Sequence, residues 1–534
     1  MTQIPPIPLS PVLSRLPPLH PKSPFDYNLA FGSIALIILT LSAPHTGGWK
    51  LFRAGIAAPI SISVFGYIIL CAEDVYDINH WGVAILMSTF MMRISEFFIF
   101  FPPEENCHRL VPKSRLHPTS TSHLETTATT TTAPRQDEKE EQEEQEVLTP
   151  EPVPQPFTLS KLYWATSLWF SYRGVGWNTV CPLGGSSRRH PYLRKSTRKS
   201  FIKHNIKIYI LYYLIDDFFR AIRNIYSAPF FSGLPGSPTY DSLTQIERAI
   251  NSTAVVVKVW FVLVNSHILW GMTCVIVGGI LGWEGEMFTP WGWPPLFGDL
   301  HELWRYPGLS TMWSRTWQGY NRRWLYVLGW IGIGENVLGL THTGISAHPT
   351  VPITTTSTSS SSANSLHTSG QTSPSHPIPT SSPRLPTRRM SSKLMIQNLI
   401  KSLITFLLSG LNHDVGSLAL ILKNHPKNQA VYLSDVMRLT PFFVLQPFAL
   451  AVEALFKTLW RRLKSKSYMK GQEPTWLTFM ERIIGFIWTW VWLGYTARYF
   501  VEGMAQLGVY RRDGVDREMF LSVWGGLIWG KWWI

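Results

Sequence analysis

The 534-residue sequence is poor in cysteine and in charge, and each shortage excludes a class of protein. Its four cysteines, Cys71, Cys107, Cys181 and Cys274, are scattered without the short spacings of a metal site, and two of them fall inside apolar runs. We therefore expect neither a disulfide framework nor a zinc or other metal site. Only 15% of the residues are charged, whereas 45% are hydrophobic.

The hydrophobic residues form runs long enough to cross a bilayer, because about 20 helical residues span about 30 Å of hydrocarbon. Clear candidates are residues 27–43, 54–72, 81–101, 254–281 and 483–501. Weaker candidates are residues 206–222, 324–340, 394–411, 439–456 and 520–533. These runs predict an all-α, polytopic integral membrane protein of roughly eight to ten transmembrane helices. A soluble protein with buried helices is disfavoured by the number of long runs.

A cleavable signal is also lacking. Residues 1–24 are rich in proline and poor in charge, and the apolar run that follows is long enough to remain in the membrane. We therefore expect a multi-pass protein anchored by its own spans, located in the endoplasmic reticulum.

Two polar stretches interrupt the apolar runs. One is rich in Thr, Glu and Pro, the other in Ser and Thr, and both lack apolar periodicity, so we expect disordered insertions that carry no chemistry. The predicted organisation is a Pro-rich tail (1–24), N-terminal transmembrane helices (25–103), the first insertion (104–157), a middle transmembrane block (158–340), the second insertion (341–393) and a C-terminal transmembrane block (394–534).

The net charge of +14 comes with an acidic run at residues 137–146. Basic residues gather at 188–207 and 457–470, both beside candidate spans, and the positive-inside rule places such segments in the cytosol. A nucleic-acid-binding patch is the rival interpretation, and the flanking spans disfavour it. We expect the bilayer to be a partner and nucleic acid not to be one.

This orientation makes residues 223–252 lumenal, provided that residues 206–222 cross. The sequon Asn251-Ser252-Thr253 lies at the end of that loop and is a candidate glycosylation site. The next crossing returns residues 282–322 to the cytosol.

Three further full crossings would place the basic residues 457–470 in the lumen, so one of these runs is expected not to cross fully. Residues 324–340 are the candidate, because Gly332, Gly334, Glu335 and Asn336 fall at mid-depth. Such polar, flexible backbone suits a re-entrant or pore-lining element.

Asn412, His413 and Asp414 interrupt an apolar stretch of the C-terminal block. Ionisable residues at membrane depth are costly and usually mark function, and histidine is the natural general base near neutral pH. The alternative is that His413 merely begins an interfacial loop. Asp414 is not expected to orient His413, because adjacent residues on a helix do not face each other.

The stretch TMWSRTWQGYNRRW at residues 311–324 is unusual in its density of tryptophan and arginine. On composition alone it is typical of an interfacial loop, with indole rings at headgroup level and guanidinium groups able to meet phosphate.

Four motifs resemble the wax synthase-like branch of the membrane-bound O-acyltransferase superfamily, in the order in which that branch carries them. They are Arg173-Gly174-Val175-Gly176-Trp177-Asn178, similar to R-G-x-G-W; Pro294-Pro295-Leu296-Phe297-Gly298, similar to PLFG; Met312-Trp313-Ser314-Arg315-Thr316-Trp317-Gln318, similar to F-W-G-R-x-W-H; and Ser409-Gly410-Leu411-Asn412-His413, similar to S-G-x-x-H. Two departures are Met312 for phenylalanine and Gln318 for histidine.

The resemblance implies a membrane enzyme whose spans surround a buried reaction tunnel and which transfers an acyl group from coenzyme A to a hydroxyl. It implies His413 as the base, and Gln318 as an amide donor to the acyl carbonyl. Residues expected to bind substrate are Trp313, Arg315, Trp317, Asn412 and Arg173. Coenzyme A phosphates are expected to meet Arg315, together with Arg322, Arg323 or the basic residues 188–207.

No bound cofactor is expected, since acetyl-CoA or a longer acyl-CoA is the co-substrate. The polar insertions resemble those of fungal acetyltransferases that act on terpenoid alcohols, which we favour as the acceptor. Long-chain wax or sterol ester synthesis is the alternative. A transporter using His413 and Glu335 is disfavoured, because no repeated halves with paired broken spans are evident; a scaffold that has lost activity is a further alternative because of Gln318.

Overall fold

The computed structural model describes residues 23–24, 27–73, 77–112, 148–178, 196–232, 236–317, 319–341, 392–424, 431–467, 474–510 and 521–532. The expected insertions, except for their ends, and the Pro-rich tail, except for its last two residues, lie outside the described residues. So do Gln318 and parts of both basic segments.

Within the described residues the fold is helical, as predicted. The longer helices are α2 (Tyr27–Ser42), α4 (Ala58–Cys71), α5 (Asp77–Ile94), α9 (Leu159–Phe170), α10 (Arg198–Tyr226), α11 (Gln245–Leu281), α15 (Ser392–Asn424), α17 (Thr440–Ser467) and α18 (Thr475–Gln506). Shorter helices include α3 (Gly47–Phe52), α6 (Pro103–Asn106), α12 (Leu300–Arg305), α13 (Leu309–Thr311), α14 (Arg322–Trp324), α16 (Leu433–Val436) and α19 (Val523–Trp529). The short strands β1 (Ser23–Pro24) and β2 (Ala72–Glu73) pair in parallel, and β3 (Leu110–Pro112) and β4 (Leu148–Pro150) pair antiparallel.

Within the described residues, five helical segments are long and apolar enough to cross a membrane by length and composition: Gly47–Cys71, Ile78–Phe100, Gln245–Leu281, Ser392–Asn424 and Thr440–Lys464. Together with the helical fold, these segments confirm the prediction of an all-α membrane protein. The shorter apolar helix Asn28–Ser42 accompanies them. The number of transmembrane helices, expected to be eight to ten, stays a prediction, since the five segments were found by length and composition among the described residues only.

Two of the weaker candidate runs form helices too short to cross a bilayer, which was expected for residues 324–340 but not for residues 520–533. The run 520–533 contains only the seven-residue helix α19, which Gly530 ends with a positive φ of 67°, and seven residues cannot cross a bilayer. The run 324–340 forms α14 and then the 13-residue π-helix η9 (Leu325–Val337), also too short to cross alone. Glu335 of η9 is buried against Lys401 of α15, with 3.0 Å between Oε1 and Nζ.

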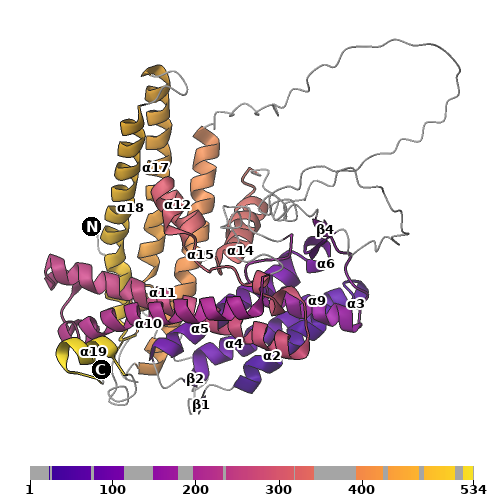
Figure 1. Ribbon diagram of the computed structural model, residues 1–534. Coiled ribbons are helices and arrows are strands. Elements are labelled where there is room, and N and C mark those ends of the chain that lie inside the picture. The colour runs from indigo at the N-terminus through magenta and orange to yellow at the C-terminus, as the bar shows by residue number, and fades with distance from the viewer. Residues whose placement is uncertain are drawn as a thin grey trace, which may run out of the picture.

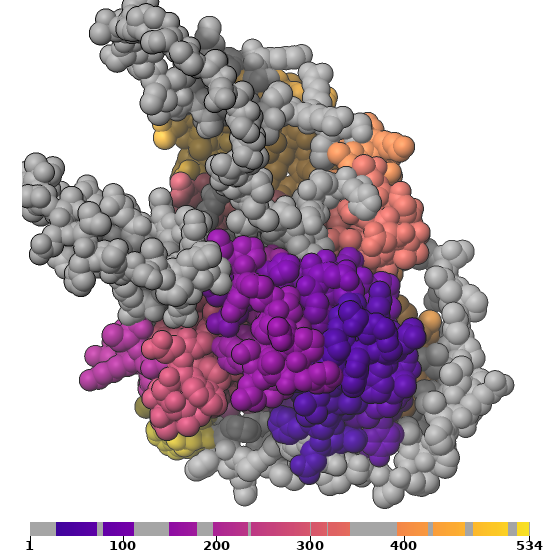
Figure 2. Space-filling view, turned by 90° about the vertical axis from the view of Figure 1, so that its right-hand side faces the viewer, coloured from indigo at the N-terminus to yellow at the C-terminus, as the bar shows by residue number. Residues whose placement is uncertain are grey.

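Helix α15 lies at the centre of the arrangement, where α17, α5 and η9 pack against it. Figure 1 shows α15, α17 and α18 as long, steep helices, while α10 and α11 run side by side across their lower part. Figure 2 shows the N-terminal helices as a continuous block, with the C-terminal helices emerging above it. Segments from all three predicted blocks therefore meet around α15.

Helix α11 shows how local sequence signals determine where a long helix begins and ends. Thr244 and Glu247 form a capping box at its start, and Gly282 ends it with a φ of 67°. Asn251, the expected glycosylation site, lies inside this helix with 0% of its surface exposed. A glycan needs an accessible amide, so this placement argues against glycosylation of the folded chain.

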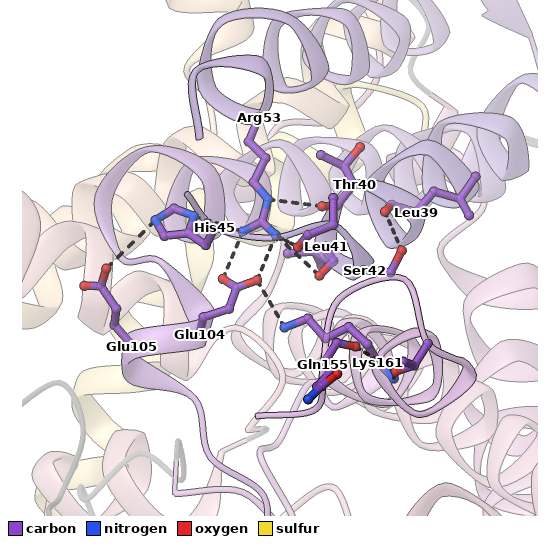
Figure 3. Close-up of polar contacts among 12 residues, drawn as sticks. Leu39, Thr40, Leu41, Ser42, His45, Arg53, Glu104, Glu105, Gln155 and Lys161 are labelled. Atoms are coloured by element: carbon purple, nitrogen blue, oxygen red, sulfur yellow. Dashed lines mark hydrogen bonds and ion pairs between the residues drawn. The ribbon is translucent and has the colours of Figure 1, made fainter. Parts of the chain in front are cut away.

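A buried arginine secures the end of α2, as Figure 3 shows. Arg53 donates from Nε to the Thr40 carbonyl (3.1 Å) and from Nη2 to the Ala43 carbonyl (2.6 Å), which are carbonyls that the ending helix leaves without helical partners. Both terminal nitrogens of Arg53 also bind Glu104, at 2.9 and 2.8 Å, and Lys161 reaches the same carboxylate at 3.2 Å. These contacts join α2, α6 and α9.

Candidate active site

A large cavity of about 2030 Å³ is lined by residues from many parts of the described chain. Its wall contains two residues predicted from the motifs, Trp313 and Trp317, and the predicted base, His413. Helices α5, α10, α11, α15, α17 and α18 all contribute to the wall. Much of the lining near His413 is aromatic, including Phe442, Phe443 and Phe500, so this part of the cavity suits an apolar molecule.

The ring of His413 is held in one orientation by its own helix. Nδ1 lies 2.7 Å from the carbonyl oxygen of Ser409, one turn earlier on α15. Because a carbonyl only accepts, Nδ1 carries the proton, and in the neutral ring Nε2 has the free lone pair. The ring packs against Phe443 with 4.5 Å between centroids, and against Trp81 and Phe500 at 6.0 and 6.1 Å. A histidine in this state is equipped to accept a proton from a bound alcohol.

The neighbours of His413 on α15 hold the helix in place. Asp414 is buried and accepts hydrogen bonds from the backbone N–H groups of Leu439 (3.0 Å) and Thr440 (3.2 Å) and from the Thr440 hydroxyl (2.5 Å). It therefore caps the start of α17, where a carboxylate is favoured by the helix dipole. Gly410 lies at the same contact, where a Cβ would come within 2.7 Å of Thr440 Oγ1.

Asn412 was expected to bind substrate, but the structure places it behind the cavity wall. Its side chain is buried, and Nδ2 donates to Thr89 Oγ1 of α5 at 3.4 Å. The contact ties α15 to α5, which indicates a structural role.

The loop that carries Trp313 is fixed at its start by a carboxylate from α17. Glu453 accepts from the backbone N–H of Leu309 (2.6 Å) and from the Ser310 hydroxyl (2.7 Å), and its partner on α17 is Lys457 (2.7 Å). These contacts hold the first turn of α13, which continues into η8 (Met312–Thr316). Trp313 in η8 then packs against Phe406 of α15, with 5.4 Å between ring centroids.

The PLFG-like motif packs directly on this loop. The backbone N–H of Gly298 donates to the Thr316 carbonyl at 3.0 Å, and a Cβ at position 298 would lie 2.0 Å from the Arg315 carbonyl oxygen. Only glycine permits this approach. Phe297 packs against Trp317 with 5.3 Å between centroids. The two motifs thus form one structural unit.

Arg173 was expected to bind substrate, yet the structure gives it a positioning role. Its Nη1 donates to the carbonyls of Pro294 (2.6 Å) and Pro295 (2.5 Å), and it is not part of the cavity wall. Burial lowers the pKa of Arg173 to about 10, and nearby Arg322 acts in the same direction. Arg173, from the motif similar to R-G-x-G-W, therefore fixes the backbone of the PLFG-like motif.

His267 of α11 is a buried histidine that was not predicted from the sequence. Its Nε2 lies 2.9 Å from the Pro294 carbonyl and its Nδ1 lies 2.8 Å from the Tyr320 hydroxyl. Nε2 must donate and Nδ1 must accept, so both ring nitrogens are engaged. No motif signalled this residue, because its partners come from a loop far along the chain.

The arginines expected to bind coenzyme A phosphates are mostly engaged elsewhere. Arg323 is buried against Glu96 at 2.6 Å, and Arg322 donates to the carbonyl of Trp317 at 2.9 Å. The Arg315 side chain is 44% exposed, lies 3.4 Å from Glu302 and is not in the cavity wall. The structure therefore does not bring Arg315 together with His413.

Comparison with known proteins finds one informative relative. The chain is 28% identical over 179 residues to an acetyltransferase of Arthrobotrys oligospora, a match that covers 32% of this chain and 34% of the relative. The aligned part thus spans about a third of that relative's length. No known family profile matches the sequence, and no solved structure matches it.

Proposed function

We propose that the protein is a membrane-bound O-acyltransferase, related to the wax synthase-like branch, that transfers acetyl from acetyl-CoA to a hydroxyl of a terpenoid-type alcohol. The observation that carries the proposal is His413, whose Nδ1 is bound to the Ser409 carbonyl while its ring lines a large aromatic cavity. The likeness to an acetyltransferase over a third of the chain supports acyl transfer as the reaction class.

In the proposed reaction, Nε2 of His413 accepts the proton of the acceptor hydroxyl as the oxygen attacks the thioester carbonyl carbon. The new C–O bond forms, the C–S bond breaks, and the departing thiolate receives the proton from the imidazolium. The products are the ester and free coenzyme A, and no acyl-enzyme forms. Trp313 and Trp317 form the apolar wall beside the reacting groups.

Gln318 follows Trp317 directly in the chain and is proposed to donate a hydrogen bond from its side-chain amide to the developing oxyanion. One such donor contributes on the order of 3 kcal/mol to transition-state stabilisation. The proposed location is the endoplasmic reticulum membrane, with acetyl-CoA arriving from the cytosol.

The test uses purified protein in nanodiscs, labelled acetyl-CoA and an alcohol extract of the host. Wild type should form a labelled ester, whereas His413→Ala and His413→Gln should lose at least about 1,000-fold in kcat, as expected for removal of a general base acting with its binding site. An unchanged melting temperature would show that both variants are folded. Full transfer by a folded His413→Ala protein would refute the assignment.

Donor preference separates acetyl transfer from wax ester synthesis. The rate should be measured with acyl-CoA donors from acetyl to palmitoyl at a fixed concentration of alcohol. Preference for acetyl supports the proposal, and preference for palmitoyl favours the long-chain alternative.

A further inference from the structure

Five cations line part of the cavity wall. They come from three helices: Arg220 and Arg223 of α10, Arg248 and Lys258 of α11, and Arg498 of α18. Ionisable side chains within membrane helices are costly, and they usually face a protein-lined cavity that handles a polar ligand. We call these five residues the cationic end.

Two of the five cations are matched by buried carboxylates of α10. Arg220 lies 2.5 Å from Asp217, and Lys258 lies 3.2 Å from Asp216. Such pairs largely cancel each other's charge. They therefore leave no positive excess for a ligand.

Arg248 and Arg498 have no such match, since no carboxylate among the described residues lies within ion-pair distance of either. Arg248 donates to the backbone carbonyls of Tyr240 (3.0 Å) and Asp241 (2.5 Å), and these bonds fix its guanidinium without neutralising it. Arg498 donates to the Tyr499 hydroxyl at 2.8 Å. Asp241 also lines the cavity, so one carboxylate faces two oriented arginines. The wall here carries an excess of positive charge.

A chain of packed rings connects this region to the base. Phe500 lies two residues after Arg498, and its ring centroid is 6.1 Å from that of His413. Phe500 also packs in one apolar cluster with Tyr510, whose ring lies 4.5 Å from the Arg223 guanidinium. His413, Trp313 and the cationic end all line the same cavity, so one elongated molecule can contact both the proposed base and the arginines.

The cationic end lies far from the segment predicted to be cytosolic. Helix α10 begins at Arg198, within the basic residues 188–207, and reaches Arg220 about 33 Å later at 1.5 Å per residue. That length is about the thickness of the bilayer core. In the predicted topology, in which residues 206–222 cross, coenzyme A arrives from the cytosol at the other end, so we assign the anion bound here to the other substrate.

Building on the proposed function, we infer that the acceptor is a hydroxy acid, with its hydroxyl at His413 and a carboxylate at the far end of its apolar skeleton bound by Arg248 and Arg498. Arginine suits this task because its planar guanidinium can donate two parallel hydrogen bonds to a carboxylate. The aromatic wall between the two sites accommodates the apolar skeleton.

The test is equilibrium binding to the full-length protein in nanodiscs, without acetyl-CoA. The probe is lithocholic acid, a rigid polycycle with a hydroxyl and a carboxylate at opposite ends, and its methyl ester is the uncharged match. Wild type should bind the acid roughly 10-fold more tightly than the ester, the effect expected of one charge-assisted contact. Arg248→Gln and Arg498→Gln should each lose most of this preference, and Arg248→Lys should retain part of it.

The control is Arg461→Gln, which changes an exposed arginine near the C-terminal end of α17 and should leave the preference unchanged. Melting temperatures establish that each variant is folded. Equal binding of acid and ester by wild type, or an unchanged preference in both glutamine variants, would overturn the inference.

Turnover then separates the inference from the proposed function. With acetyl-CoA present, Arg248→Gln should raise KM for the acid roughly 10-fold and leave KM for acetyl-CoA unchanged. A rise in KM for acetyl-CoA alone would assign the cationic end to the donor and refute the inference. An acid preference that is lost in Arg248→Gln, without any acetyl transfer by wild type, would uphold the anion site and refute the proposed function.

Discussion

At the scale of single residues, His267 and His413 differ in how many of their ring nitrogens have a hydrogen-bond partner. Both ring nitrogens of His267 have hydrogen-bond partners, Pro294 and Tyr320. Among the described residues His413 has a partner only at Nδ1, the carbonyl of Ser409. A histidine with both nitrogens engaged has no lone pair for a substrate proton. The number of engaged nitrogens therefore distinguishes the proposed base from the structural residue, although both have aromatic rings as neighbours.

This contrast predicts different consequences of the same substitution. His267→Gln should weaken the link between α11 and the PLFG-like motif, lower the melting temperature and reduce kcat less than about 10-fold, because only positioning suffers. His413→Gln should leave the melting temperature nearly unchanged and remove activity. Thermal unfolding and single-substrate kinetics on both variants check this. The opposite pattern would transfer the catalytic role to His267.

Glu104 offers a prediction about pH. Burial alone would raise its pKa, but the hydrogen bond and charge of Arg53, with Lys161, outweigh burial and hold the pKa below its usual value of 4.5. A lowered folded pKa contributes stability above the unfolded pKa and loses it as the pH falls through the folded pKa. Glu104→Gln should therefore cost about 1.5–3 kcal/mol near pH 7 and progressively less as the pH falls through the lowered folded pKa.

The measurement is the unfolding midpoint in detergent from pH 3 to pH 8. Glu105 is the matched control, since its side chain is 65% exposed and lies 4.0 Å from His45. Glu105→Gln should change stability little at any pH. A pH-independent loss in Glu104→Gln would show that the carboxylate acts through packing and not through its charge.

At the scale of elements, α17 connects the base to the loop that carries Trp313. Its first residues are held by Asp414, the neighbour of His413, and its Glu453 holds Leu309 and Ser310 at the start of the loop. One rigid helix therefore sets the distance between the two sides of the site. Helix-borne contacts of this kind position catalytic groups more closely than loop contacts alone.

Glu453→Gln should consequently impair catalysis more than folding. The amide retains the size of the carboxylate, but it has only one accepting oxygen. In either orientation its NH₂ group faces a donor, the N–H of Leu309 or the ammonium of Lys457, so the loop should shift. A shift of about 1 Å costs up to about 100-fold in rate, and we expect kcat to fall by about 10- to 100-fold. Glu481→Gln, which removes a carboxylate paired with Lys464 near the other end of α17, is the control. Equal activity of the two variants would contradict this role of α17.

Most of the long helices could be predicted from the sequence. The side-chain contacts that form the candidate site could not. Apolar runs indicate helices locally, and the capping box of Thr244 and Glu247 is readable from spacing. Asp414 was set aside as an orienter of His413, yet its role depends on Leu439 and Thr440, which lie 25 residues or more away. Arg173 and Asn412 were predicted to bind substrate because a motif identifies residues but does not show the direction in which their side chains point. The functional roles of His413 and Gln318 stay predictions.

At the scale of the whole molecule, residues from all three predicted transmembrane blocks line one cavity. We expect the polar segments between the blocks only to connect the ends of the elements that flank them. The chain leaves the N-terminal block through β3 and re-enters through β4. In this pair Leu110 lies opposite Pro150, and Pro112 lies opposite Leu148. The two residues that flank 113–147 are therefore strand partners.

Because Pro112 and Leu148 are paired, a two-residue turn can connect them without moving either strand. Asn-Gly favours the hairpin turn whose twist matches that of paired strands. Replacing residues 113–147 with Asn-Gly should therefore leave the melting temperature nearly unchanged and kcat within about twofold of the wild-type value. The replacement should leave kcat unaffected because neither β3 nor β4 contributes a residue to the cavity wall. Thermal unfolding and the acetyl-transfer assay measure both quantities. Loss of activity in a protein that melts normally would mean that residues 113–147 take part in substrate handling, and the cavity described here would then be only part of the site.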